Sequence, residues 1–162
     1  MTVREPLVII NGQIQQLPSG DTINGTPPAG SDTVIVATNN QGDTINKCMA
    51  VYLDAADSVK LASANGAAAT KFFGFVDDDD IGTGNTGNIR YSGIMTGNTA
   101  QWDAVTGETG GLVANQIYYL SSTVSGNTIN AAPTAATKYV VPVGIGINET
   151  DLLIYQRSTV LL

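Results

Sequence analysis

Short runs of β-branched and aromatic residues alternate with turn residues along most of the chain. From residue 33 onward, candidate strands recur roughly every 8–15 residues with Gly, Asn, Asp and Ser between them, which is typical of an all-β sandwich or barrel. We therefore predict an antiparallel β-sandwich or β-barrel-like body over residues 33–162. The candidate strands are Thr33–Thr38, Asn46–Leu53, Ser58–Ala62, Lys71–Val76, Gly87–Thr96, Ala100–Val105, Gln116–Ser121, Thr128–Ala131, Tyr139–Ile147 and Asp151–Arg157.

Helical signals are sparse in this pattern. Only the alanine-rich stretch Ala55–Ala69 favours a helix, and polar or glycine pairs interrupt it, so we expect a turn or two there at most. Within Lys71–Val76, the alternation of a regular strand predicts Phe73 and Phe75 on one face and Phe72 on the other.

The N-terminal residues differ from the body. Asn11-Gly12 stands between two β-prone runs in residues 7–17, and this dipeptide favours a two-residue hairpin turn because both positions tolerate positive φ. Residues 24–32 have the composition of a linker. We therefore predict an extended N-terminal arm over residues 1–32 that contains a hairpin. About thirty extended residues could reach roughly 100 Å, which suits an arm that grips a neighbour.

Composition excludes several chemistries. The chain contains no histidine, so Ser-His-Asp and Cys-His nucleophilic sites are excluded and the commonest metal ligand is missing. Its single cysteine, Cys48, can form neither a zinc site nor an intrachain disulfide. Because Cys48 lies in an apolar run, we expect a small buried hydrophobe in preference to a reactive thiol. We predict that the protein is not an enzyme and needs no cofactor.

Charge narrows the choice of partners. The net charge is −7, and the seven basic residues are scattered singly, so the basic stripe needed for nucleic-acid binding is not visible. No run approaches the ~18 apolar residues of a membrane span. The N-terminus lacks the apolar region of a signal peptide, so we expect production and use without Sec export. We predict neither a nucleic-acid nor a membrane partner.

Two features allow alternative interpretations. Asp77–Asp80 is the densest charge cluster, and it could ligate calcium through its carboxylates or form an exposed acidic turn between strands. The second interpretation is favoured, because the EF-hand pattern is not matched. The chain ends on Leu161-Leu162, and these side chains could be buried either within this domain or against another subunit.

A resemblance adds a functional expectation. Residues 8–22, Val-Ile-Ile-Asn-Gly-Gln-Ile-Gln-Gln-Leu-Pro-Ser-Gly-Asp-Thr, resemble a segment of structural proteins of tailed bacteriophages. In the body, Gly74-Phe75-Val76, Trp102-Asp103, Ile117–Leu120 and Val143–Gly146 resemble a pattern of phage head-decoration and fibre modules. The resemblance implies a trimeric virion protein bound to capsomers or fibres.

The resemblance leads to one main hypothesis and one alternative. The main hypothesis is a non-enzymatic head decoration (cement) protein, a homotrimer that binds the major capsid protein on the outer surface of the virion. The alternative is a receptor- or glycan-binding module of a head or tail fibre. Strand addition to a neighbour would use apolar residues of the arm and the chain end. The candidate interaction residues are Leu7, Val8, Ile9, Ile10, Ile14, Leu17, Leu161 and Leu162.

Overall fold

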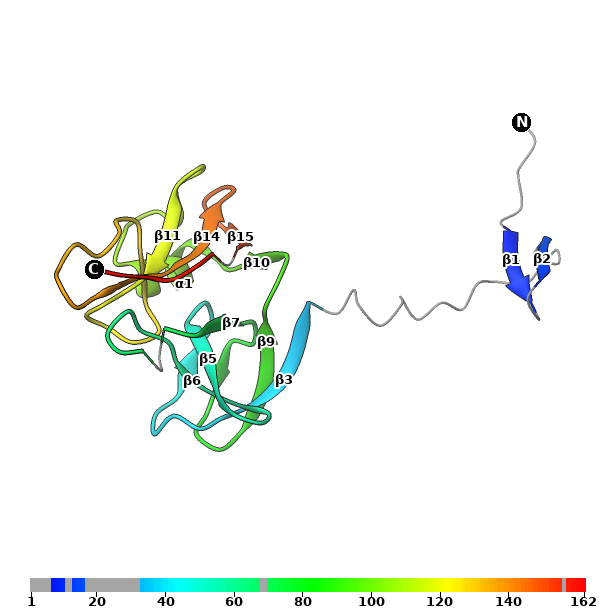
Figure 1. Cartoon of the computed structure of the whole chain (residues 1–162), viewed down its shortest axis with the longest axis horizontal. Coiled ribbons are helices and arrows are strands. Elements are labelled where there is room, and N and C mark those ends of the chain that lie inside the picture. The colour runs from blue at the N-terminus through cyan, green and yellow to red at the C-terminus, as the bar shows by residue number, and fades with distance from the viewer. Residues whose placement is uncertain (1–6, 11–12, 17–32, 68–69, 156) are drawn as a thin grey trace. The chain divides into compact units, whose positions relative to one another are not determined.

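The computed structural model describes residues 7–10, 13–16, 33–67, 70–155 and 157–162 (Figure 1). The chain separates into two units, Met1–Ser31 and Asp32–Leu162, which are treated separately below. Short strands dominate the described residues, together with one short helix. The predicted all-β class is confirmed.

The first unit contains a β-hairpin. Strand β1 (Leu7–Ile10) pairs with β2 (Gln13–Gln16) in antiparallel register, and Ile10 stands opposite Gln13. The predicted hairpin is therefore confirmed. The Asn11-Gly12 turn, Leu17 and the linker lie outside the described residues.

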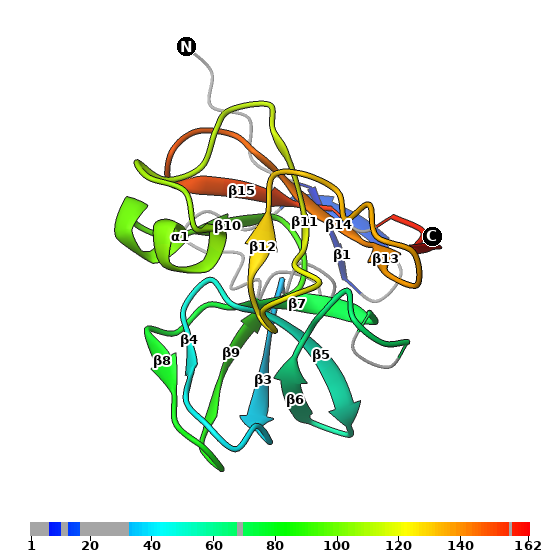
Figure 2. The same ribbon diagram turned by 90° about the vertical axis from the view of Figure 1, so that its left-hand side faces the viewer.

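The second unit, the body, begins with a closed five-stranded barrel, seen in the lower half of Figure 2. The barrel strands, in order around it, are β3 (Val34–Asn39), β6 (Ser58–Leu61), β5 (Ala50–Ala55), β7 (Phe72–Val76) and β9 (Thr86–Arg90). The β3–β6 pair is parallel and the other pairs are antiparallel. Beside the barrel, β4 (Ile45–Asn46) pairs with β8 (Asp80–Ile81). Small and branched side chains fill this first core: Ala37, Ile45, Val51, Val59, Val76, Ile81 and Ile89.

A five-stranded antiparallel sheet covers the barrel in the upper half of Figure 2. Its strands, in spatial order, are β10 (Ile94–Thr96), β15 (Asp151–Ile154), β14 (Pro142–Gly146), β11 (Ile117–Leu120) and β12 (Thr128–Ile129). Next to it, β13 (Tyr139–Val140) pairs with β16 (Val160–Leu161). The inner face of the sheet contributes Tyr118, Val143 and Leu152 to a second core, where they join Phe75 of the barrel and Trp102.

The expected strand Ala100–Val105 is wrong, because the helix α1 (Thr99–Thr106) occupies these residues. Asn98 and Gln101 form a reciprocal capping box, and Gly107 ends the helix in the left-handed conformation. Trp102 and Val105 are buried three residues apart, as one helix face requires. For Ala55–Ala69 we expected at most one or two helical turns, and the described residues of this stretch contain no helix.

Three predicted strands are each divided in the structure. Asn46–Leu53 falls partly in β4 and partly in β5, with Cys48 between them at a φ of 66°. Gly87–Thr96 becomes β9 and β10, because Gly93 takes a φ of 79° and turns the chain between the barrel and the sheet. Tyr139–Ile147 becomes β13 and β14. The short strands β4, β8 and β16 complete the set, and β8 and β16 had no sequence prediction.

The predicted faces of the phenylalanines are also wrong. In the β5–β7 ladder, Val51 pairs with Gly74 but Tyr52 pairs with Phe72, so Phe73 is an extra residue at a bulge. The bulge breaks the alternation. Phe72 and Phe75 consequently pack edge-on in the same core with ring centroids 5.1 Å apart.

Candidate interaction surfaces

The N-terminal hairpin carries five of the predicted interaction residues. Leu7, Val8, Ile9 and Ile10 form β1, and Ile14 of β2 stands opposite Ile9. A two-stranded hairpin by itself is at best marginally stable in water.

Of the three remaining predicted residues, Leu17 lies outside the described residues, Leu161 belongs to the C-terminal strand β16 and Leu162 follows it. Val160, Leu161 and Leu162 are 55%, 59% and 47% exposed. Their backbone is nevertheless held, because the amide of Leu162 donates to the carbonyl of Lys138 at 3.0 Å. Burial of Leu161 and Leu162 within this domain is therefore wrong, while burial against another subunit stays a prediction.

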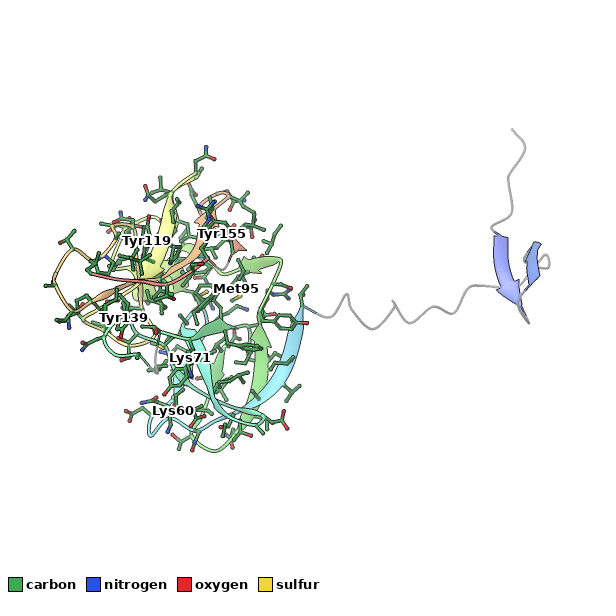
Figure 3. All side chains as sticks on the ribbon, viewed as in Figure 1. Lys60, Lys71, Met95, Tyr119, Tyr139 and Tyr155 are labelled. Atoms are coloured by element: carbon green, nitrogen blue, oxygen red, sulfur yellow. The ribbon has the colours of Figure 1, made fainter. Side chains whose placement is uncertain are left out.

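Three cationic residues lie near β16. The backbone of Lys138 bonds to Leu162, and its side-chain nitrogen donates to Asn65 Oδ1 at 2.6 Å. Lys71 and Arg157 line a shared hollow of about 130 Å³ together with Thr159. The Arg157 guanidinium lies over the ring of Tyr155, 4.5 Å from its centroid. In Figure 3, Tyr139 lies on the side of the body on which Figure 1 places the C-terminus. We call the following residues the C-terminal patch: Lys71, Lys138, Arg157, Val160, Leu161 and Leu162.

Sequence reasoning missed a row of aliphatic residues on the outer face of the five-stranded sheet. Ile94 of β10 pairs with Leu153 of β15, Leu153 pairs with Ile145, and Ile145 pairs with Ile117. Ile94 and Leu153 are 49% and 43% exposed. The alternation of buried Leu152 with exposed Leu153 was a signal that could have located this face.

The Asp77–Asp80 segment has its first two carboxylates occupied by protein donors. Arg90 donates to Asp77 Oδ2 through Nε at 3.1 Å and Nη2 at 2.7 Å. Asp78 accepts from the backbone and side-chain nitrogens of Asn88 at 2.7 and 2.9 Å. Asp79 and Asp80 are exposed. Within the ranges that the structure describes, no group of three or more acidic or cysteine side chains is placed to hold a metal ion.

Cys48 is fully buried, as predicted. It lies between β4 and β5 at a φ of 66°, and its amide donates to the carbonyl of Val76 at 3.0 Å. Burial raises the pKa of the thiol to about 12, so it stays protonated and unreactive at neutral pH.

In the part of the chain that the structure describes, two surface hollows of similar volume are large enough for a small ligand, and a smaller one of about 350 Å³ lies between helix α1 and the residues around Lys47 and Asp79. One, of about 590 Å³, lies between residues 109–114 and 147–150. Val113, which lines this hollow, is held by Tyr118, whose hydroxyl accepts from the Val113 amide at 2.9 Å and donates to Glu108 at 2.7 Å. Burial raises the pKa of Tyr118 to about 12, so this support stays protonated. The other, of about 600 Å³, lies at one end of the barrel and is lined by residues 38–42, 56–58 and 83–84.

Comparisons with known proteins do not assign a family. No protein-family model matches the chain, and no curated protein matches its sequence significantly. Among the described residues, no helix has both the length and the apolarity to cross a membrane.

Proposed function

We propose that the protein is a non-enzymatic capsid decoration protein of a tailed bacteriophage. In this proposal it forms homotrimers on the outer head surface of the virion and stabilises the head by binding the major capsid protein. The N-terminal hairpin makes the principal contact. The resemblance of residues 8–22 to phage structural proteins supplies the biological context.

One observation carries the proposal: an apolar hairpin forms a unit separate from a body that has its own two cores. Apolar strands with few partners are suited to strand addition, in which main-chain hydrogen bonds give affinity and alternate side chains give specificity. A body of short strands around buried cores provides the stable mass that a capsid-bound protein needs.

The test uses the full chain with substitutions at paired hairpin positions. Ile9→Asp together with Ile14→Asp places two charges at facing positions of β1 and β2. We expect this variant to lose most of its binding to undecorated capsids in a co-sedimentation assay, because a carboxylate in an apolar contact is strongly unfavourable. Removal of residues 1–30 should have the same effect.

The matched control is Gln13→Asp with Gln15→Asp, which adds the same charge to the same hairpin without removing an aliphatic side chain. We expect this control to bind much more tightly than the isoleucine variant. If the isoleucine variant or the truncated chain saturates capsids at wild-type affinity, the hairpin is not the capsid-binding element and this part of the proposal fails.

A receptor- or glycan-binding module is the second candidate. The hollow between residues 109–114 and 147–150 favours it, since concave surfaces lined by a few polar groups are where small ligands bind. Glycan-array binding by the isolated protein would support this candidate, whereas the decoration proposal predicts none. Thr109→Trp, which fills the mouth of the hollow, should abolish any such binding.

A further inference from the structure

Charges are segregated along the chain and on the body. Residues 58–76, 109–148 and 152–162 contain no Asp or Glu, yet they contain Lys60, Lys71, Lys138 and Arg157. Three of these four cations belong to the C-terminal patch. The fourth, Lys60, forms an ion pair with Asp54 at 3.1 Å, so its charge is compensated locally. The C-terminal patch therefore combines three cations with three exposed aliphatic side chains.

The opposite combination lies at one end of the barrel. Buried Asn39 joins the loop after β3 to β8 at this end, because its side-chain nitrogen donates to the carbonyls of Asp43 at 2.9 Å and Ile81 at 2.7 Å. The Thr38 amide donates to the carbonyl of Asp57 at 2.8 Å. The side chains of Asp43 and Asp57 are both exposed.

Apolar side chains accompany these acids. Leu53 is 40% exposed, and Ala55 and Ala56 are exposed beside it in the β5–β6 turn. We call Asp43, Leu53, Ala55, Ala56 and Asp57 the barrel-end surface. It matches the C-terminal patch in kind, with aliphatic groups beside charges of the opposite sign.

The two surfaces lie at different ends of the body. In Figure 2 the C-terminus and β13 are at the upper right, while the β5–β6 turn, the loop after β3 and the loop between β8 and β9 are at the bottom. One copy therefore cannot bring them together. We propose that the C-terminal patch of one copy binds the barrel-end surface of a second copy, head to tail.

The opposite charges of the C-terminal patch and the barrel-end surface indicate that a second copy of this chain is the binding partner. Opposite potentials across an interface steer the encounter and fix its register, and like charges placed together are strongly disfavoured. The patch-to-patch alternative would place Lys71, Lys138 and Arg157 against the same three cations. A head-to-tail contact uses different surfaces on each copy and closes into a ring or continues as a filament. Tyrosine and arginine are enriched among the residues that contribute most binding energy at interfaces, and Arg157 of the patch lies over the ring of Tyr155.

The test measures the oligomeric state of the full chain by sedimentation velocity over a range of protein and salt concentrations. We expect wild-type protein to associate at low salt and to dissociate as NaCl approaches 1 M, where the screening length falls to about 3 Å. The variant Lys71→Glu with Arg157→Glu reverses the sign of the charge at two positions of the C-terminal patch. The variant Asp43→Lys with Asp57→Asn reverses or removes the barrel-end charges, and Asn tolerates the left-handed φ of 52° at position 57.

Each variant alone should weaken association by about tenfold or more. The chain that carries all four substitutions should recover association, because its patch is acidic and its barrel end is basic. The control is Lys47→Glu with Glu149→Lys, which exchanges two charges outside both surfaces and should associate like wild type. If the patch variant fails to fold, Lys71→Gln with Arg157→Gln removes the same charges with less perturbation.

Any of three results would overturn the inference. The wild-type protein could be monomeric at high micromolar concentration and low salt, or both variants that change a single surface could associate as strongly as wild type. The third result is that the chain with all four substitutions does not recover association. The inference is independent of capsid binding. A chain that forms these oligomers and does not bind capsids would support the head-to-tail contact and contradict the decoration proposal.

Discussion

The indole nitrogen of Trp102 donates a 2.8 Å hydrogen bond to the backbone carbonyl of Thr150. The same carbonyl accepts from the Gly97 amide at 3.0 Å. This pair of bonds joins the start of helix α1 to the turn between β14 and β15. The helix is therefore tied to the sheet that carries the outer aliphatic row.

The first prediction concerns Trp102→Phe. The smaller ring keeps an aromatic contact near Phe75, now 6.0 Å between centroids, but loses the bond to Thr150 and leaves a void. We expect a loss of about 1–3 kcal/mol in the free energy of unfolding, measured by urea denaturation with far-UV circular dichroism. Ala104→Ser, exposed on the same helix, should cost under about 0.7 kcal/mol. Equal losses in the two variants would contradict the importance of this contact.

The second prediction concerns Gly97→Ala. A Cβ at this position would lie 2.5 Å from the Cys48 sulfur and 3.0 Å from the Trp102 indole nitrogen, so the core must shift to admit it. We expect a loss of about 1–3 kcal/mol. Gly42→Ala is the control, because nothing lies within 4 Å of a Cβ there, and it should stay within about 0.5 kcal/mol of wild type. A neutral Gly97→Ala would show that the packing is looser than described.

The third prediction concerns Cys48. Because burial raises the pKa of its thiol to about 12, native protein at pH 8 should react with an aromatic disulfide reagent far more slowly than a free thiol does. The same protein in denaturant should react at one thiol per chain, since Cys48 is the single cysteine. Full reaction of the native protein within minutes would show that the second core opens readily.

The fourth prediction concerns acid stability. Hydrogen bonds from Asn148 at 2.8 Å and Thr96 at 2.7 Å lower the pKa of Asp151. Because the pKa of Asp151 is lower in the folded protein than the unfolded value of about 3.9, its ionised carboxylate stabilises the folded protein above that pH. This stabilisation is lost as the pH falls through the folded-state pKa. The urea midpoint of Asp151→Asn should therefore fall less than that of wild type between pH 5 and pH 2. Parallel curves for Asp151→Asn and wild type would count against the linkage.

The sequence predicted the elements whose signals are local. The Asn-Gly dipeptide predicted the β1–β2 hairpin, and runs of β-branched and aromatic residues located β3, β6, β7 and β11. The signals that failed depend on partners distant in the chain. Phe73 bulges because of its pairing with β5, and the capping box at Asn98 outweighed the strand pattern of Ala100–Val105.

The candidate interaction surfaces also differ in how far the sequence could predict them, according to whether their residues are neighbours in the chain. The apolar hairpin could be recognised in the sequence, as could the apolar chain end Leu161-Leu162, although strand β16 itself was not predicted. The C-terminal patch and the barrel-end surface could not, because each gathers residues from separate strands and loops. Lys71 and Arg157 are 86 positions apart in the chain and line one hollow only after β7 and the chain end have packed together.

The most direct test of the central proposal is to locate the protein in intact virions by cryo-electron microscopy. The decoration proposal predicts density for the β-rich body on the outer head surface, with the hairpin strands β1 and β2 against the major capsid protein. Heads reconstituted with Ile9→Asp, Ile14→Asp protein should lack that density. Density on a tail fibre alone, or particles without the protein, would contradict the proposal.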